Sequence, residues 1–339
     1  MNINNRKKFI KNVAPTILIV CSLLLSGCSG KTGNKATNID LSTGELISQE
    51  SNDRLSDDVI KNIKNFVKNA PSISNISLSS DISSLSLEAE LEKRKNNYVI
   101  SDENEKVLET DIVNVTFVEV TLSSGDATYE LNVGYDFNFN EEFDASFENG
   151  IIGHKIGEKF IIENCKMPDG STAKVKVKIN YVTRKVDSLD MLKEKLPEGF
   201  DSYSSFLSKA LEESAKANDV WEQLIKTVTV ETDSQEFKSY YSDKYNNAYE
   251  YFKNYNSSVN EEVLKSSIEK QCKKEFIAYY YGKEFGIDYG EYREEELEKI
   301  ALFYGYTLES FKAKYSEDVI KNTVYMDSVG KEFAERIGK

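Results

Sequence analysis

The 339-residue sequence contains one histidine and four cysteines, too few for several classes of active site. A histidine-dependent catalytic triad would have to use His154, which lies in an expected turn. A zinc site usually takes about four ligands, and one histidine with two available cysteines does not supply them. No glycine-rich phosphate loop precedes an expected helix. We therefore expect neither a metal ion nor a cofactor.

Basic residues are also few: 43 lysines and arginines stand against 57 aspartates and glutamates, a formal net charge of −14. Removal of an N-terminal segment with four basic residues would bring the charge to −18. Nucleic acids and anionic lipids repel such a chain. We therefore expect no nucleic-acid partner, and we expect that the protein does not lie flat on an anionic lipid surface.

The apolar run at residues 13–25 is too short to cross a bilayer, which takes about 20 residues. It follows a basic stretch at residues 6–11, as in a secretory signal peptide. Residues 25–28 (LSGC) resemble the bacterial lipobox, whose cysteine is acylated and becomes the N-terminus after cleavage. The resemblance implies a signal peptide over residues 1–27 and a lipid on Cys28, which would anchor the protein to the outer face of the cytoplasmic membrane. The alternative is an ordinary signal peptide with a chance cysteine.

The remaining cysteines do not form a disulfide framework. Cys21 would leave with the signal peptide and Cys28 would carry the lipid, so Cys165 and Cys272 remain. The sequence leaves open whether these two meet, and we expect free thiols.

Residues 28–55 are rich in serine, threonine, asparagine and glycine, a composition typical of a flexible tether. Residues 56–110 are expected to form a helical connecting segment. Apolar residues recur at helical spacing over residues 57–68, and residues 87–97 are charged and helical in pattern. Residues 72–86 are ambiguous between a loop and an edge strand.

The stretch at residues 147–158 (FENGIIGHKIGE) predicts a short helix followed by a turn. Phe147, Ile151 and Ile152 would share one buried face of that helix. Gly153 stands where a C-cap glycine is expected.

Three strand patterns flank this helix, at residues 128–134, 159–163 and 173–182. The last of them (AKVKVKINYV) alternates apolar and polar residues, which indicates an antiparallel strand with one wet face. We therefore predict an α+β protein in which residues 111–185 form a small antiparallel sheet around one short helix.

Four blocks in this region, at residues 111–117, 129–134, 147–158 and 173–182, resemble the FKBP family of peptidyl-prolyl isomerases. Over roughly residues 87–336 the chain is similar to trigger factor, a bacterial chaperone that carries an FKBP domain between other domains. The order and spacing of the four blocks carry the resemblance.

Prolyl isomerisation needs neither proton transfer nor a metal. An apolar pocket that favours a twisted amide lowers the barrier of about 18–20 kcal/mol by differential binding. The same residues would also suit the core of a small domain, which is the alternative interpretation. By position in the family motif, Phe147 would form the floor of the pocket. Its walls would be Phe117, Tyr129 and Val175, and Ile151 and Ile152 would lie beneath it.

The sequence departs from the FKBP pattern at the rim of this pocket. Residues 118–128 lack the usual Phe-Asp pair, and residues 161–172 lack the usual tyrosine. Asp144 stands where an apolar residue is expected, after an insertion at residues 135–142, and Val175 replaces an aromatic residue. Whether the pocket is catalytic is therefore left open.

Beyond the sheet the hydrophobic period changes from 2 to 3.6, so residues 186–339 are expected to be helical. Ser202 predicts an N-cap, Ser258 with Glu261 a capping box, and Gly286 a C-cap. The expected helices are one that follows Ser202 and five more at residues 234–255, 258–286, 289–303, 307–314 and 317–336.

Parts of this region, at residues 196–213, 269–287 and 295–311, resemble the C-terminal domain of trigger factor and related periplasmic chaperones, whose helices cradle unfolded chains. Aromatic residues crowd two of the expected helices. Ring faces with hydroxyl groups suit sequence-tolerant contact with unfolded chains, and the alternative is packing between helices. These residues are Tyr240, Tyr241, Tyr245, Tyr249, Tyr251, Phe252 and Tyr255, and then Tyr279, Tyr280 and Tyr281.

The resemblances imply a membrane-anchored foldase of a Gram-positive cell envelope. Its partners would be unfolded or newly exported polypeptides and their proline-containing segments. Two alternatives remain: an inactive FKBP-like domain in a peptide-binding holdase, or a structural surface lipoprotein that uses its helices as a spacer.

Overall fold

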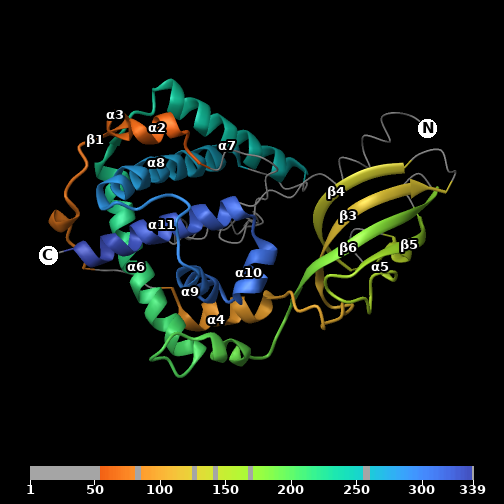
Figure 1. The fold of residues 1–339 in the computed structure, drawn as a ribbon. Helices are drawn as coiled ribbons and strands as arrows, with labels where there is room; N and C mark the ends of the chain where they lie inside the picture. Colours follow the sequence, from red (N-terminus) through yellow and green to blue (C-terminus); the bar gives the residue numbers. More distant parts are fainter. Residues whose placement is uncertain are drawn as a thin grey trace, which may run out of the picture. The chain divides into compact units, whose positions relative to one another are not determined.

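The computed structural model describes residues 54–80, 85–123, 128–139, 144–166, 171–254 and 260–337. It confirms the α+β class: an antiparallel sheet and a set of helices (Figure 1). The chain divides into two compact units, and each is described by itself.

Each unit is assembled from segments that are far apart in the sequence, whereas the sequence suggested consecutive domains. The sheet unit comprises Leu91–Pro197 together with Ala301–Tyr315. The helical unit comprises the described residues up to Glu90, then Glu198–Ile300 and the chain from Ser316. The expected connecting segment at residues 56–110 is thus shared between the units. Periodicity reports local structure only, so it gave no sign of this division.

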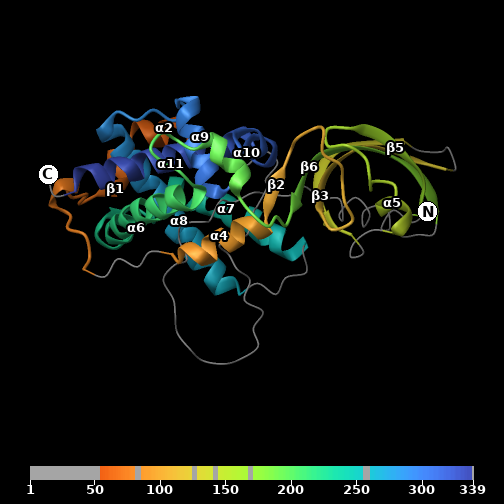
Figure 2. The same ribbon diagram turned by 90° about the horizontal axis from the view of Figure 1, so that it is seen from below.

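Five antiparallel strands form the sheet: β2 (Tyr98–Ile100), β3 (Ile112–Leu122), β4 (Thr128–Asn138), β5 (Lys159–Lys166) and β6 (Thr172–Arg184). The order is β2-β6-β3-β4, and β5 also pairs with β6. The sheet curls around the short helix α5 (Ala145–Glu148), as Figure 2 shows. The predicted strands are confirmed, and each extends beyond its expected range.

Alternation along β6 separates the two faces of the sheet. Val175, Val177 and Ile179 are buried, whereas the residues between them lie towards solvent. Strand β3 pairs with β6, and the register of this pairing shifts between Phe117 and Glu119. Such a bulge increases the local twist of a strand, which suits a sheet that curls around a helix.

A buried carboxylate fixes the start of β3 to the end of β6. Asp111 accepts hydrogen bonds from Nε and Nη2 of Arg184 at 2.7 and 2.9 Å, and Arg184 also pairs with Glu105 at 3.1 Å. This bidentate geometry is the strongest form of a carboxylate–guanidinium pair. The pair raises the pKa of Arg184, chiefly through the hydrogen bond with Asp111.

The C-terminal segment of the sheet unit is held by Arg94 of helix α4 (Leu87–Asn96). Nε and Nη2 of Arg94 donate to the carbonyl oxygen of Phe303 at 2.9 and 2.7 Å. Gly305 has a φ of +86°, and a Cβ there would lie 2.8 Å from the Arg94 side chain. A glycine is therefore needed for this close approach.

The helix expected at residues 57–68 is broken into two. The structure has α2 (Asp57–Lys61), α3 (Ile63–Phe66) and then the short strand β1 (Val67–Lys68), which pairs with β7 (Thr229–Val230). The break lies at Asn62, whose φ and ψ of −104° and 20° leave the helical region. A 3-10 helix, η1, follows at Ile73–Asn75.

The helical unit contains most of α6 to α11. Their bounds are α6 (Tyr203–Thr227), α7 (Gln235–Asn254), α8 (Glu261–Phe285), α9 (Glu294–Tyr304), α10 (Leu308–Lys314) and α11 (Glu317–Arg336). Of these, α10 and the end of α9 belong to the sheet unit, as does the 3-10 helix η2 (Asp190–Lys195).

Several predicted helix ends are confirmed. Ser202 caps α6 through its side chain, and Gly286 ends α8 in the left-handed conformation with a φ of 72°. The predicted capping box at the start of α8 is wrong, because Asn260 is the N-cap and accepts from Glu262 N and Val263 N. Ser258 lies outside the described residues. Helix α9 starts at Glu294, five residues later than expected.

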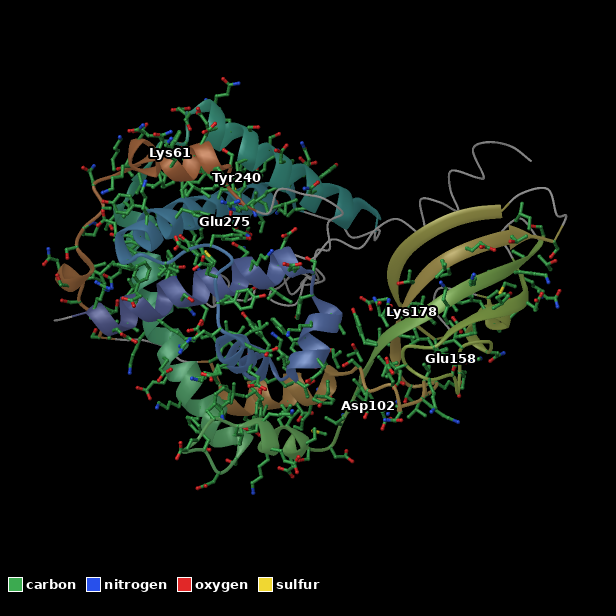
Figure 3. The ribbon with its side chains drawn as sticks, in the orientation of Figure 1. Lys61, Asp102, Glu158, Lys178, Tyr240 and Glu275 are labelled. Atoms are coloured by element: carbon green, nitrogen blue, oxygen red, sulfur yellow. The ribbon has the colours of Figure 1, made fainter. Side chains whose placement is uncertain are left out.

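Helices α7 and α8 are joined by a buried polar cluster (Figure 3). The Glu275 carboxylate, with 2% of the residue exposed, accepts from the Tyr240 hydroxyl at 2.8 Å, Lys244 Nζ at 3.1 Å and Gln271 Nε2 at 3.2 Å. Burial and the charge of Glu275 hold the pKa of Tyr240 well above its usual value. Three donors therefore satisfy one buried negative charge.

We predict that Glu275→Ala destabilises the protein by about 3–5 kcal/mol, because it leaves Lys244 buried without its carboxylate. Urea unfolding measures the change. Glu284→Ala on the same helix is the matched control, since Glu284 pairs with Lys64 at the exposed surface and should change stability little. Equal losses for the two variants would contradict the prediction.

Candidate functional site

Three phenylalanines meet where the sheet curls around α5. The Phe147 ring, from α5, stacks on Phe117 of β3 with centroids 5.4 Å apart and an interplanar angle of 18°. It also packs against Phe137 of β4 at 5.8 Å. All three rings are buried, and Phe147 is only 4% exposed. The structure therefore brings the predicted floor and one predicted wall into direct contact.

The structure places two more of the predicted pocket residues in the same hydrophobic cluster. Val175 and Ile151 are both buried beside these rings. Ile152 is 38% exposed, so the prediction that it lies beneath the pocket is wrong. Helix α5 ends at Glu148, and the following residues form turns, so helical spacing no longer sets which residue faces inward.

The remaining predicted residue is Tyr129. Its backbone pairs with Val120 of β3 near the start of β4, and its side chain lies outside the described residues.

Asp144 has a structural role that explains its place in the motif. It is the N-cap of α5, and its carboxylate accepts from the backbone N–H of Ser146 at 2.9 Å. Hydrogen bonds from Ser146 lower the pKa of Asp144. An exposed charged cap thus stands where the FKBP pattern has an apolar residue.

Sequence reasoning missed Phe137 and Phe139, which pack edge to face at 5.4 Å within the cluster. Residues 135–142 were interpreted as an insertion, whereas β4 continues through Asn138. The alternation in YDFNF at residues 135–139 is the strand pattern that would have indicated them.

The single histidine is held in a turn beside the sheet. His154 stacks on Phe160 at 3.6 Å between ring centroids, and its Nδ1 lies 3.0 Å from Glu158 Oε1. The pKa of Glu158 is lowered, first by a hydrogen bond from the Lys155 backbone and then by His154. These contacts indicate that His154 stabilises the turn.

The phenylalanine cluster offers apolar contacts from buried side chains. No group of three or more histidine, cysteine, aspartate or glutamate side chains is placed to hold a metal ion among the residues the structure describes. Cys165 is buried beside the cluster, and its Sγ lies 3.6 Å from the carbonyl oxygen of Ile162. Burial, with the nearby charge of Asp144, raises the pKa of Cys165 to about 11. Cys165 and Cys272 are both free thiols.

A second candidate surface lies on α7, where three tyrosines recur every fourth residue. Tyr241 and Tyr245 stack at 6.1 Å, and Tyr245 and Tyr249 at 5.9 Å. All three are half-buried, and Lys265 Nζ of α8 lies 5.7 Å from the Tyr245 ring centroid. We call these three residues the tyrosine row.

Other tyrosines of these helices are part of the core. Tyr240, Tyr279 and Tyr281 are buried, and Tyr280 is half-buried. The side chains of Tyr251, Phe252 and Tyr255 lie outside the described part of the chain. Packing between helices therefore accounts for the buried tyrosines, whereas the tyrosine row and Tyr280 pack against the core and are also partly open to solvent.

Within the residues that the structure describes, no helix is both long enough and apolar enough to span a bilayer.

Comparisons with known proteins give limited information. No family model matches the sequence, and no curated protein matches it. Among solved structures, the chain is similar to one reported for promiscuous substrate recognition in the folding and assembly activities of the trigger factor chaperone. The identity is 17%, the TM-score is 0.31, and the match covers 79% of this chain and 72% of the other. At this level of similarity, the match decides neither family nor activity.

The raised pKa predicts how Cys165 reacts. A pKa of about 11, against an ordinary 9.0, keeps the native thiol protonated at pH 9, where about half of an unfolded thiol is ionised. We expect alkylation of native Cys165 at pH 9 to be at least about 50-fold slower than in urea, and to accelerate as the pH rises towards 11. Peptide mapping by mass spectrometry measures the rate for Cys165 alone, and similar rates with and without urea would contradict the assignment.

Proposed function

We propose that this protein is a chaperone that holds unfolded polypeptides outside the cytoplasmic membrane. The observation that carries the proposal is the tyrosine row on α7. Three stacked rings at one-turn intervals offer apolar faces and hydroxyl groups along about 12 Å of helix. Such a surface contacts many sequences without requiring a particular one.

Two further features support this function. The sequence blocks in the helical region resemble the client-binding arms of trigger factor. The buried Glu275 cluster joins α7 to α8 at Tyr240 and Lys244, each the residue before a member of the tyrosine row, Tyr241 and Tyr245. A rigid support lowers the entropy cost of presenting aromatic side chains to a flexible client.

The lipobox-like residues 25–28 support anchoring through a lipid on Cys28 at the outer face of the membrane. Metabolic labelling with a fatty acid tests this: the label should be incorporated and should be lost in Cys28→Ser. Equal labelling of the native protein and of Cys28→Ser would exclude Cys28 as the site of lipid attachment.

A second candidate function is prolyl isomerisation in the sheet unit. It is favoured by the contact between Phe117 and Phe147 within the curl of the sheet. The rings are also well packed as a core, so a binding domain without catalysis fits the same geometry. In that case the domain would grip apolar or proline-containing segments.

The holding function is tested with the triple variant Tyr241→Ala/Tyr245→Ala/Tyr249→Ala. Each aromatic contact contributes about 0.5–1.5 kcal/mol, so we expect binding of a permanently unfolded protein to weaken by at least about tenfold. Fluorescence anisotropy measures binding, and light scattering follows aggregation of a refolding client. The matched control is Tyr280→Ala/Tyr292→Ala, which removes half-buried rings outside the row. Failure of the native protein to bind or protect either client would exclude the chaperone function.

The isomerase activity is tested in the same preparations with a proline-limited refolding assay. Phe147→Leu keeps an apolar side chain in the core and removes the ring, and circular dichroism checks the fold. Acceleration that this variant loses would establish catalysis at Phe147. Protection from aggregation without acceleration would establish a holdase, and tight binding of a folded partner alone would favour a structural spacer.

A further inference from the structure

The hairpin of β5 and β6 differs in charge from the rest of the chain. Residues 159–178 carry five lysines against one glutamate and one aspartate, within a chain of net charge −14. Alternation in β6 directs the valines inward, so the lysines of this strand lie on the outer face of the sheet. A basic surface is thus concentrated on one face of an acidic protein.

Strand register brings several of these side chains together. Lys159 of β5 is directly opposite Lys178 of β6, and Ile161 is opposite Lys176. Directly opposite residues have Cβ atoms about 4.5–5.5 Å apart, and like charges in such a pair repel. Figure 3 labels Lys178 on β6. We call Lys159, Ile161, Lys176 and Lys178 the basic patch.

The lysines of the basic patch are available to an external anion. Lys159 and Lys178 are exposed and Lys176 is half-buried, and none of the three forms an ion pair with another described residue. The nearby acidic groups include Glu163, which pairs with Lys174 at 3.0 Å, and Glu119, which is opposite Lys176 and accepts from the Thr121 hydroxyl at 3.4 Å. Glu158, which precedes Lys159, lies 3.0 Å from His154 Nδ1, and Glu130 of β4 is opposite Glu119.

The apolar member of the patch indicates which kind of anion fits. Ile161 is 54% exposed, more than the other exposed large apolar residues of the described chain. An exposed isoleucine among lysines matches the boundary of a lipid bilayer, where an apolar side chain enters the acyl region and ammonium groups meet phosphates. A soluble polyanion would use the lysines and leave the isoleucine in water.

We propose that the basic patch docks the sheet unit on the surface of a membrane containing anionic phospholipid. The net charge alone argued against such contact, but it acts at long range and is screened over about 10 Å, whereas the patch acts at the surface itself. Only this face would approach the bilayer, because the acidic remainder is repelled. The inference does not depend on a lipid at Cys28 or on client binding.

The test is lysine footprinting of the full chain. The chain is mixed with vesicles of phosphatidylcholine alone or of equal parts phosphatidylcholine and phosphatidylglycerol, and acetylation of each lysine is followed by mass spectrometry. Each lysine held at an anionic surface strengthens binding by about fivefold. We therefore expect Lys159, Lys176 and Lys178 to be acetylated at least about fivefold more slowly with the anionic vesicles. Lys61 and Lys299, both exposed in the helical unit, should be unaffected. Equal acetylation of the patch in the two kinds of vesicle would overturn the proposal.

Variants separate the patch from net charge. In Lys176→Glu/Lys178→Glu, the protection of Lys159 should disappear, whereas Lys61→Glu/Lys299→Glu carries the same net charge and should retain it. Ile161→Ser should reduce protection by up to about tenfold with no change in charge. If the two double variants behave alike, general electrostatics explains the result and the patch is not a site.

Soluble polyanions distinguish the membrane from other partners. Inorganic polyphosphate or RNA is added to a mixture of the full chain and phosphatidylcholine vesicles. Protection by either polyanion but not by anionic vesicles would overturn the proposal in favour of a polymer partner. Protection by anionic vesicles that falls in Ile161→Ser supports it.

Discussion

The two-residue period of β6 is the constraint on which the sheet unit depends. This strand pairs with β2, β3 and β5, so its alternation sets which face of the whole sheet is buried. A shift of one residue would exchange the valines with the lysines and place three ammonium groups in the core. The buried face then receives α5 and the phenylalanine cluster, and the opposite face carries the basic patch. Both candidate sites of this unit therefore follow from one strand.

The phenylalanine cluster is the hydrophobic core of the sheet unit, and it is also where the second candidate function is proposed. Phe147 packs against both Phe117 and Phe137, and it therefore contributes to the stability of this core. Asp144 caps α5, so its charge is tolerated at the edge of the cluster. The cluster holds these apolar rings together at the centre of the curled sheet.

The helical unit uses a different device. A single buried carboxylate, Glu275, collects donors from both α7 and α8. We expect this buried charge to favour one register of α7 against α8, because another register would separate Glu275 from Tyr240 and Lys244. The tyrosine row lies on the same helix as Tyr240 and Lys244, which contribute two of these donors.

The sequence by itself determined the elements whose period and caps are local: strands β4, β5 and β6, helix α11 from Glu317 to Arg336, and the Ser202 and Gly286 caps. The proximity of Phe117, Phe147, Ile151 and Val175 was expected from the family resemblance, and the structure places all four in one cluster. Only the tertiary structure decided what depends on distant contacts. Ile152 points to solvent because α5 is one turn long, and Phe137 and Phe139 enter the core because β4 continues along β3. The segment Ala301–Tyr315 joins the sheet unit through Arg94, more than 200 residues earlier. Pairing between such remote segments leaves no periodic trace in a single sequence, whereas helix caps and strand alternation act over a few residues and do.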